Sequence, residues 1–263
     1  GLTHPADRHL LEEVETHLED FQHELIARGR TRKHVKLTLR RIKAVLERAR
    51  CKRLADIRPQ AVRDALLALP VAIETRNHHL IACKAFTRWL WRQGRMAEDP
   101  LVGLGRWNAE PDRRVHRRAL TQEELGRLIA TTKNSPWTFR GLSGPDRAAL
   151  YVAAAYTGLR VSELASLTRA SLAFQGDPPT VTVSAAYSKH RRQDVIPIPP
   201  WVAEYLQQWL SKRQVLPGPG VPLWPGGWKG RAAFMLRQDL EAAGIPFLDQ
   251  SGNRADFHAL RAF

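Results

Sequence analysis

The stretch that decides the fold is Thr157-Gly158-Leu159-Arg160-Val161-Ser162-Glu163-Leu164. The apolar periodicity of residues 145–156 predicts a helix that ends at Gly158, and a second helix is expected to begin near Val161. Such a turn presents Arg160, whose planar guanidinium can give two hydrogen bonds to a phosphate. Glu163 lies one helical turn further on and could orient Arg160. A surface salt bridge that caps the second helix would use the same residue types, so both interpretations stay open.

A second informative stretch is a predicted β-hairpin. Residues 180–186 and 194–198 are rich in β-forming side chains and flank a polar turn, which predicts one hairpin inside an otherwise helical domain. Lys189 lies in this turn and is followed by Arg191 and Arg192. An ammonium group in that place could donate a proton to a leaving oxygen. A solvated hairpin turn also favours lysine, arginine and serine, which is the alternative interpretation.

The third stretch is Asp256-Phe257-His258-Ala259-Leu260-Arg261. We expect it to be helical, and positions three apart on a helix face the same side, so His258 and Arg261 could address one phosphate. Arg261 would supply a second guanidinium, and the imidazole of His258 could relay a proton near neutral pH. The alternative is a structural histidine.

Taken in order, the arginine turn, the hairpin lysine and the His-x-x-Arg pair resemble the motifs of the tyrosine recombinases, the phage-integrase-like family. The resemblance implies that Arg160 and Arg261 bind the scissile phosphate, with Glu163 in support. It also implies that Lys189 protonates the leaving 5′ oxygen and that His258 relays the proton of the nucleophile.

The resemblance extends over nearly the whole chain. Residues 75–90 are similar to the last helix of the family's core-binding domain, and residues 118–125 are similar to the entry into its catalytic domain. The chain departs from the family pattern where Ser188 and His190 replace a usual glycine, and where Ala262 follows the last arginine in place of a common histidine.

These observations predict a mostly α fold in two domains. Residues 1–97 are expected to form a four-helix, core-binding (SAM-like) bundle, and residues 98–118, where glycine and proline interrupt the periodicity, a basic linker. Residues 119–263 are expected to form an α-rich catalytic domain with a small antiparallel β-hairpin. Its first helix should begin at Thr121, which forms a capping box with Glu124.

Basic side chains gather in several places that could contact DNA. The helix expected after the cap residue Thr31 carries apolar side chains on one face and lysine and arginine on another, with few acids nearby. A solvated helix face is the alternative interpretation of this stripe. The candidate DNA-contacting residues on the stripe, the last helix of the first domain, the linker and the hairpin are Lys33, Lys36, Arg40, Lys43, Arg76, His79, Arg113, Arg114, Arg117, Arg118, Arg191 and Arg192.

Composition agrees with a nucleic-acid partner. The 41 Lys and Arg residues outnumber the 26 Asp and Glu, and the net charge of +15 favours a polyanion through counterion release. Cys51 and Cys83 are too few for a disulfide framework and lack the spacing of a zinc site, so we expect neither a metal nor another cofactor and a reducing, cytoplasmic location. No apolar run approaches the length of a bilayer, and membrane insertion is not expected.

The resemblance implies a mechanism in which a tyrosine attacks a DNA phosphate, forms a 3′-phosphotyrosyl bond and releases a 5′ hydroxyl. The tyrosines present all precede the His-x-x-Arg pair, and none lies in the family's nucleophile context: Tyr151, Tyr156, Tyr187 and Tyr205. We therefore expect the nucleophile beyond residue 263, and the chain as it stands should not complete the reaction.

The partner implied by the resemblance is double-stranded DNA, bound by a homotetramer with a dimer at each site. Two other functions remain open from the sequence. One is a non-catalytic DNA-binding relative that occupies sites, and the other is an enzyme resembling type IB topoisomerases, which share the chemistry without strand exchange.

Overall fold

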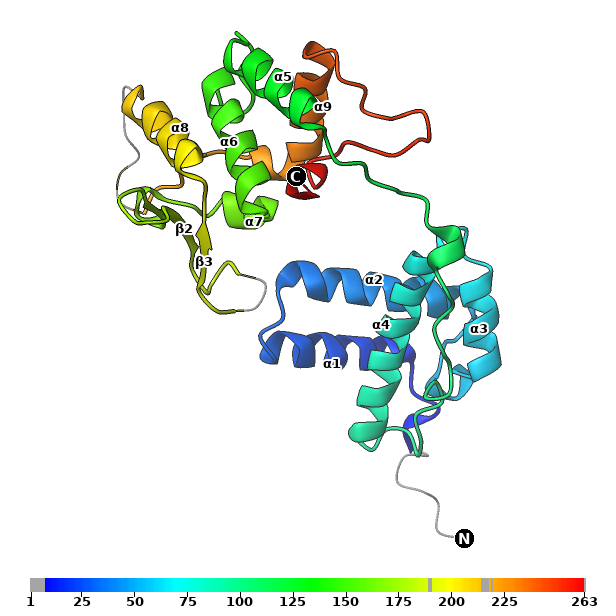
Figure 1. Ribbon diagram of the computed structural model, residues 1–263. Helices are drawn as coiled ribbons and strands as arrows, with labels where there is room; N and C mark the ends of the chain where they lie inside the picture. Colours follow the sequence, from blue (N-terminus) through cyan, green and yellow to red (C-terminus); the bar gives the residue numbers. More distant parts are fainter. Residues whose placement is uncertain (1–7, 189–190, 214–217, 219, 263) are drawn as a thin grey trace. The chain divides into compact units, whose positions relative to one another are not determined.

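The computed structural model describes residues 8–188, 191–213, 218 and 220–262 and divides into two compact units, Gly1–Arg114 and Val115–Phe263 (Figure 1). The fold is mostly helical with a small antiparallel sheet, so the predicted fold class is confirmed. Within the described residues, no helix has both the length and the apolar character needed to cross a membrane.

Within the described residues, the first unit is a helical bundle of α-helices and short 3-10 segments. Its elements are α1 (Val14–Ala27), α2 (Arg32–Arg48), η2 (Leu54–Asp56), α3 (Pro59–Leu67), α4 (Ile73–Arg92) and η3 (Glu110–Asp112). Gly29 ends the first helix with a φ of +71°, and the side chain of Thr31 accepts the backbone N–H of His34, as the sequence predicts. Phe21, Ile42 and Phe86 meet in the core, where all three are buried.

Much of the segment expected to be a linker packs on the first unit. Leu101 is fully buried in its core. The side chain of Asn77 on α4 binds the backbone N–H and carbonyl of Trp107 at 3.0 and 2.9 Å, and Lys84 Nζ donates to the carbonyl of Leu104 at 2.6 Å. Residues up to Arg114 therefore belong to the first unit, and side chains of α4 satisfy backbone groups of this segment.

The second unit is built around a buried helix. Its elements are α5 (Gln122–Lys133), α6 (Gly144–Thr157), α7 (Val161–Leu164), η4 (Arg169–Ser171), β1 (Leu172–Ala173), β2 (Thr180–Val183), β3 (Asp194–Pro197), α8 (Pro200–Ser211), η5 (Trp228–Arg231), α9 (Ala232–Ala242) and η6 (Ala259–Ala262). Residues 148–155 of α6 are all buried, and the small alanines let its neighbours approach closely. A Cβ at Gly144 would lie 2.4 Å from the carbonyl oxygen of Thr132, so only glycine lets α6 begin against the end of α5.

The predicted hairpin is confirmed and gains a third strand. β2 pairs antiparallel with both β1 and β3, and Val183 lies opposite Asp194. β2 ends at Val183 rather than Ala186, because the chain then turns and the hydroxyl of Ser188 donates to Asp194 at 2.5 Å. Val181 and Val183 are buried, which fastens the sheet to the core below the turn.

A buried ion pair links α6 to α9. Nε and Nη2 of Arg147 donate to the two carboxylate oxygens of Asp239 at 2.8 and 3.0 Å, and the Tyr151 hydroxyl donates to the same carboxylate at 2.6 Å. The side chains of Arg147 and Asp239 are 0% and 1% exposed. The guanidinium also donates to the carbonyls of Trp137 and Leu142, so each nitrogen of the buried group makes at least one hydrogen bond.

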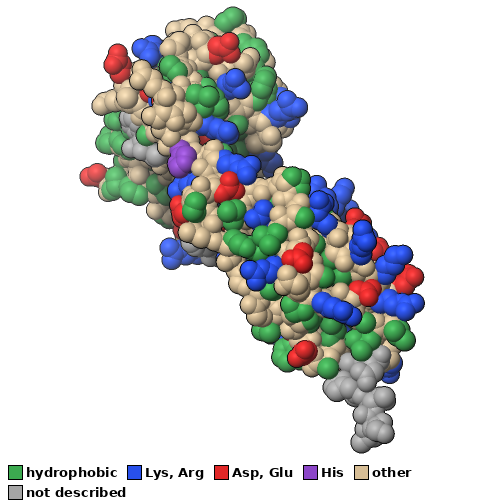
Figure 2. All heavy atoms as spheres, turned by 90° about the vertical axis from the view of Figure 1, so that its right-hand side faces the viewer, with side chains coloured by type: hydrophobic (Ala, Val, Ile, Leu, Met, Phe, Trp, Pro, Cys, Tyr) green, Lys and Arg blue, Asp and Glu red, His purple; other side chains and the backbone are tan. Residues whose placement is uncertain are grey.

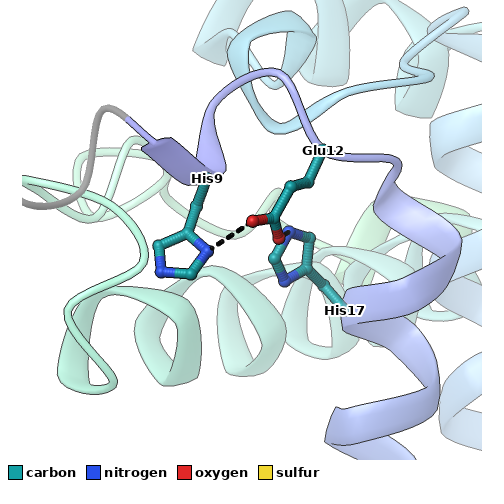
Figure 3. Close-up of side chains that lie close together, drawn as sticks. All are labelled: His9, Glu12 and His17. Carbon is teal, nitrogen blue, oxygen red and sulfur yellow. Dashed lines mark hydrogen bonds and ion pairs between the residues drawn. The ribbon is translucent and has the colours of Figure 1, made fainter.

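A histidine and glutamate cluster ties the start of the described chain to α1 and α4. Glu12 Oε1 lies 3.0 Å from Nδ1 of His9, and Glu12 Oε2 lies 3.2 Å from Nε2 of the buried His17 (Figure 3). Arg95, beyond the end of α4, donates from Nη1 to Nδ1 of His17 at 2.9 Å. Burial, and next the charge of Arg95, lower the pKa of His17.

Among the described residues, this cluster is the group of histidine and carboxylate ligands that could hold a metal ion, with ligand atoms within 4.8 Å of one another. The hydrogen bonds argue against that use. Arg95 donates to Nδ1 of His17, and Arg8 donates to Nε2 of His9 at 3.1 Å, so the opposite ring nitrogens carry the protons and face Glu12. A metal would need lone pairs at those positions, so the geometry argues against a metal at this cluster.

Removing one partner of the buried ion pair should be costly. We expect Asp239→Ala to lower the free energy of unfolding of the second unit by about 3–5 kcal/mol, because the Arg147 guanidinium stays buried without its counter-charge. Urea unfolding monitored by circular dichroism measures the loss. Glu241→Ala, at an exposed position of the same helix, is the matched control and should change the same quantity by less than about 0.5 kcal/mol. Equal effects of the two substitutions would contradict a structural role for the pair.

The lowered pKa of His17 predicts an acid-sensitive first unit. Below about pH 6.5, the unfolded imidazole takes up a proton that the folded one resists, so the free energy of unfolding should fall as the pH is lowered. His17→Gln should flatten this dependence between pH 7.5 and about 5.5, as measured by urea unfolding at each pH. His23→Gln, an exposed position on α1, should leave the dependence unchanged. An unaltered slope in the His17 variant would refute the assignment.

Candidate functional site

The arginine turn follows directly from the end of α6. Gly158 adopts a φ of +61° and its N–H donates to the carbonyl of Ala154, which ends the helix as the sequence predicts. Arg160 is the N-cap of α7. Glu163, only 5% exposed, accepts the backbone N–H of Arg160 at 2.7 Å and its Nη1 at 3.0 Å. The carboxylate therefore caps the short helix and orients the guanidinium at the same time.

Arg261 is held against the same turn. Its Nε donates to the carbonyl oxygen of Gly158 at 2.6 Å, across 103 positions of sequence. The side chain of Arg160 is 36% exposed. In the part of the chain that the structure describes, the two Nη groups of Arg261 and Nη2 of Arg160 have no hydrogen-bond partner. Two guanidiniums with unused donors thus share one surface.

His258 lies beside them in a turn that precedes η6. The expected α-helix is wrong here, because residues 257–258 form a turn and Ala259–Ala262 a 3-10 helix. The backbone N–H of Arg261 nevertheless donates to the carbonyl of His258 at 3.1 Å. A 3-10 helix has three residues per turn, so the i and i+3 side chains stay on one side and the predicted proximity survives.

A cavity of about 500 Å³ adjoins His258 and is also lined by Val161, the residue after Arg160. Asp256 in its wall accepts the backbone N–H of His258 at 2.9 Å, and Nε of Arg117 lies 2.8 and 3.0 Å from its carboxylate oxygens. Arg117 therefore comes to the candidate site from the predicted linker and offsets the negative charge beside the histidine.

The structure brings together Arg160, Glu163, His258 and Arg261. Lys189 lies outside the described residues. Arg191 and Arg192, which follow it, are exposed, and Arg192 lies 3.5 Å from Asp194.

The predicted DNA-contacting residues differ in how available they are. Lys33, Lys36 and Arg40 are exposed on α2, whereas Lys43 forms an ion pair with Glu15. Arg118 is occupied: its Nη groups bind Glu124 at 2.7 and 3.1 Å, and Nη2 also donates to the carbonyl of Pro246. The geometry gives Arg118 a structural role at the entry to the second unit.

The remaining predicted DNA-contacting residues also differ in how many of their polar atoms are already engaged. Arg76 lies over the ring of Trp107 at 5.8 Å, and Nδ1 of His79 lies 2.8 Å from the carbonyl oxygen of Thr75, so both are partly engaged. Arg113 and Arg114 are exposed, with Arg114 paired to Asp112 at 2.9 Å.

Sequence analysis missed a second basic surface in the first unit. A cavity of about 310 Å³ between α1, α2 and α4 is lined by Arg28, Arg30, Arg41, Arg88 and Arg92. The face of this unit visible in Figure 2 instead mixes Lys and Arg with Asp and Glu side chains. The i, i+4 spacing of Arg88 and Arg92 was the available signal, but the DNA contacts predicted on that helix were limited to Arg76 and His79.

The tyrosines of the second unit have environments that differ from that of a nucleophile. Tyr151 is fully buried, and burial together with the charge of Asp239 raises its pKa well above the usual value. Burial also raises the pKa of Tyr156 and Tyr205. A raised pKa disfavours the phenolate, so these three are poorly suited to attack a phosphate, and the exposed Tyr187 lies in the turn after β2.

The chain is similar to proteins of one kind in each comparison. Residues 118–222 match the model of the phage integrase family. Tyrosine recombinase XerC of Xylella fastidiosa, strains M23 and Temecula1, is 28% identical over 160 residues, which are 61% of this chain. The chain spans about half, 49%, of the length of these curated relatives.

Solved structures share the fold. A lambda integrase tetramer bound to a Holliday junction has a TM-score of 0.69 and 18% identity, covering 95% of this chain and 71% of that one. The integrase of transposon Tn1549, in complex with a circular intermediate DNA, has a TM-score of 0.69 and 16% identity, covering 93% and 84%. The motifs, the matched segment and the shared fold agree in making the chain similar to the phage integrase family and to tyrosine recombinases.

Proposed function

We propose that this protein is a site-specific recombinase that cuts and rejoins duplex DNA through a 3′-phosphotyrosyl intermediate. The observation that carries the proposal is the hydrogen bond from Arg261 to the carbonyl of Gly158, which holds a second guanidinium on the turn that presents Arg160. Two cations with unused N–H groups on one surface suit a phosphodiester, whose non-bridging oxygens gain negative charge in the transition state.

In the proposed reaction, a tyrosine oxygen attacks phosphorus, the bond to the 5′ oxygen breaks, and the 3′ side of the cut strand stays linked to the protein. Arg160 and Arg261 bind the non-bridging oxygens, His258 takes part in moving the phenolic proton, and Lys189 protonates the departing 5′ oxygen. A 5′ hydroxyl from another strand then reverses the step. The phosphotyrosyl bond conserves the energy of the phosphodiester, so ligation needs no nucleotide hydrolysis.

The tyrosines of residues 1–263 are poorly suited to act as the nucleophile of this mechanism. Tyr151, Tyr156 and Tyr205 have pKa values raised by burial, and Tyr187 stands in a turn without the family's nucleophile context. We therefore take the nucleophile from a tyrosine outside this sequence, which would have to reach the surface formed by Arg160, His258 and Arg261.

Double-stranded DNA is the proposed partner, and a homotetramer, with a dimer at each site, is the proposed assembly. The net charge of +15 and the exposed basic surfaces of the first unit support DNA binding. The lambda integrase of similar fold forms a tetramer on a Holliday junction, which supports an assembly of that kind here.

Arg160→Ala should separate chemistry from binding. In protein that carries the nucleophile, we expect at least a ~100-fold loss of the covalent protein–DNA adduct on a suicide substrate, because a transition-state contact is lost. DNA affinity, measured by fluorescence anisotropy, should change only a few-fold, since most phosphate contacts lie elsewhere.

The matched control is Arg127→Ala, which removes an exposed arginine of α5 outside the candidate site. It should retain both adduct formation and affinity. Equal losses of adduct and affinity in the Arg160 variant would contradict the proposed division of roles, and a fully active Arg160 variant would overturn the proposed function.

The basic stripe on α2 should supply salt-dependent affinity. Lys36 and Arg40 line one cavity of about 750 Å³ beside Val35 and Leu39. Replacing both by alanine should weaken DNA binding and reduce the slope of log affinity against log salt by about 2, if each contacts one phosphate. Anisotropy titrations over a range of sodium chloride concentrations measure this slope.

The comparison variant is Arg41→Ala/Arg92→Ala, which removes the same charge from the second basic surface. A reduced slope in this variant, with no change in the Lys36 and Arg40 variant, would place DNA on the surface between α2 and α4 and refute the predicted stripe.

A further inference from the structure

The cavity beside His258 contains cations that the proposed mechanism does not use. Its volume is about 500 Å³, and beyond Arg117, Val161 and Asp256–His258 it is lined by residues 229–234, at the junction of η5 and α9. Lys229 and Arg231 are exposed there, and neither has an ion-pair partner within the described residues. The positively charged side chains of Lys229 and Arg231 thus line the same cavity as His258, the candidate proton relay.

The core fixes this arrangement. Trp228 is fully buried, and its Nε1 donates to the carbonyl of Trp224 at 2.9 Å. The ring of Trp228 contacts the ring of buried Phe257, with 6.2 Å between centroids. Lys229 directly follows Trp228, and His258 directly follows Phe257, so one aromatic contact sets the separation of the two polar residues.

The cavity is positive in spite of the carboxylate in its wall. Asp256 is offset by Nε of Arg117 and by the backbone N–H of His258. Arg231 is the N-cap of α9 and makes no side-chain capping bond, and Ala232 and Ala233, the first residues of that helix, line the cavity. The partial positive charge of the helix start adds to that of the two side chains.

We infer that Lys229 and Arg231 bind a second backbone phosphate of the strand that is cut, next to the scissile phosphate. This inference rests on the proposed function and names two positioning residues for it. A strand presents its charges at regular intervals of about 3.4 Å along the duplex axis, so a phosphate held at Arg160 and Arg261 brings its neighbours along the surface past Val161 and His258. Holding a neighbouring phosphate would fix the register of the scissile one against the arginines.

The test compares the 263-residue chain with Lys229→Gln/Arg231→Gln in binding to a short DNA duplex. We expect about a tenfold loss of affinity at low salt and a salt slope reduced by about 1, as for one phosphate contact. The charge-conserving variant Lys229→Arg/Arg231→Lys should have the same DNA affinity and the same salt slope as the unaltered chain. Arg127→Gln/Arg237→Gln removes two exposed cations from the same unit outside the cavity and should change neither. Circular dichroism melting checks that all variants are folded.

Lysine acetylation followed by mass spectrometry locates the contact. Bound DNA should protect Lys229 from acetylation and leave Lys212, at the end of α8, reactive. An unchanged salt slope in the glutamine variant, or full reactivity of Lys229 on DNA, would overturn the inference while the proposed function stands. Absence of DNA affinity in the unaltered chain would overturn both.

Discussion

One hydrogen bond, from Nε of Arg261 to the carbonyl oxygen of Gly158, joins the two halves of the candidate site. The carbonyl is available because it lies where α6 ends, and the last carbonyls of a helix have no partner within it. The same helix end carries a partial negative charge, which favours a guanidinium. Gly158 in the left-handed conformation turns the chain toward Arg160 at this point, so one residue both binds the second arginine and presents the first.

The rigidity of this turn comes from the core behind it. α6 is buried along most of its length, and the Arg147–Asp239 pair fastens it to α9. Phe257, between Tyr151 and Trp228, fastens the segment that carries His258 to the same core. A site for phosphate chemistry needs its donors held in place before the charge develops, and side chains supported by a packed core meet that need.

The net charge of the chain overstates the cations available to a ligand. Arg147 and Arg118 are occupied by carboxylates and carbonyls, Lys84 holds the segment after α4, and Arg95 contacts His17 and Asp20. In the described part of the chain, lysine and arginine side chains without such partners are found on the surfaces of α2 and α4 and around the start of α9. Their placement, more than their total, supports the proposed contacts with DNA.

The sequence by itself determined the local features of the molecule. The cap at Thr31, the capping box at Thr121, the helix end at Gly158 and the pairing of β2 with β3 follow from interactions between residues near in the chain, which sequence patterns report directly. The order and the spacing of the motifs also identified Arg160, His258 and Arg261 as candidate residues of the functional site. The expected α-helix at residues 257–258 was wrong because a short segment packed through Phe257 follows tertiary contacts over local preference.

Only the tertiary structure decided which charged residues are available and which are neighbours. The packing of residues 98–114 on α4, the hydrogen bond from Arg118 to the carbonyl of Pro246 and the grouping of Lys229 with His258 each depend on contacts between segments distant in sequence. Periodicity carries no record of such contacts, because the energy of burying a side chain or pairing a charge depends on what the folded chain brings beside it.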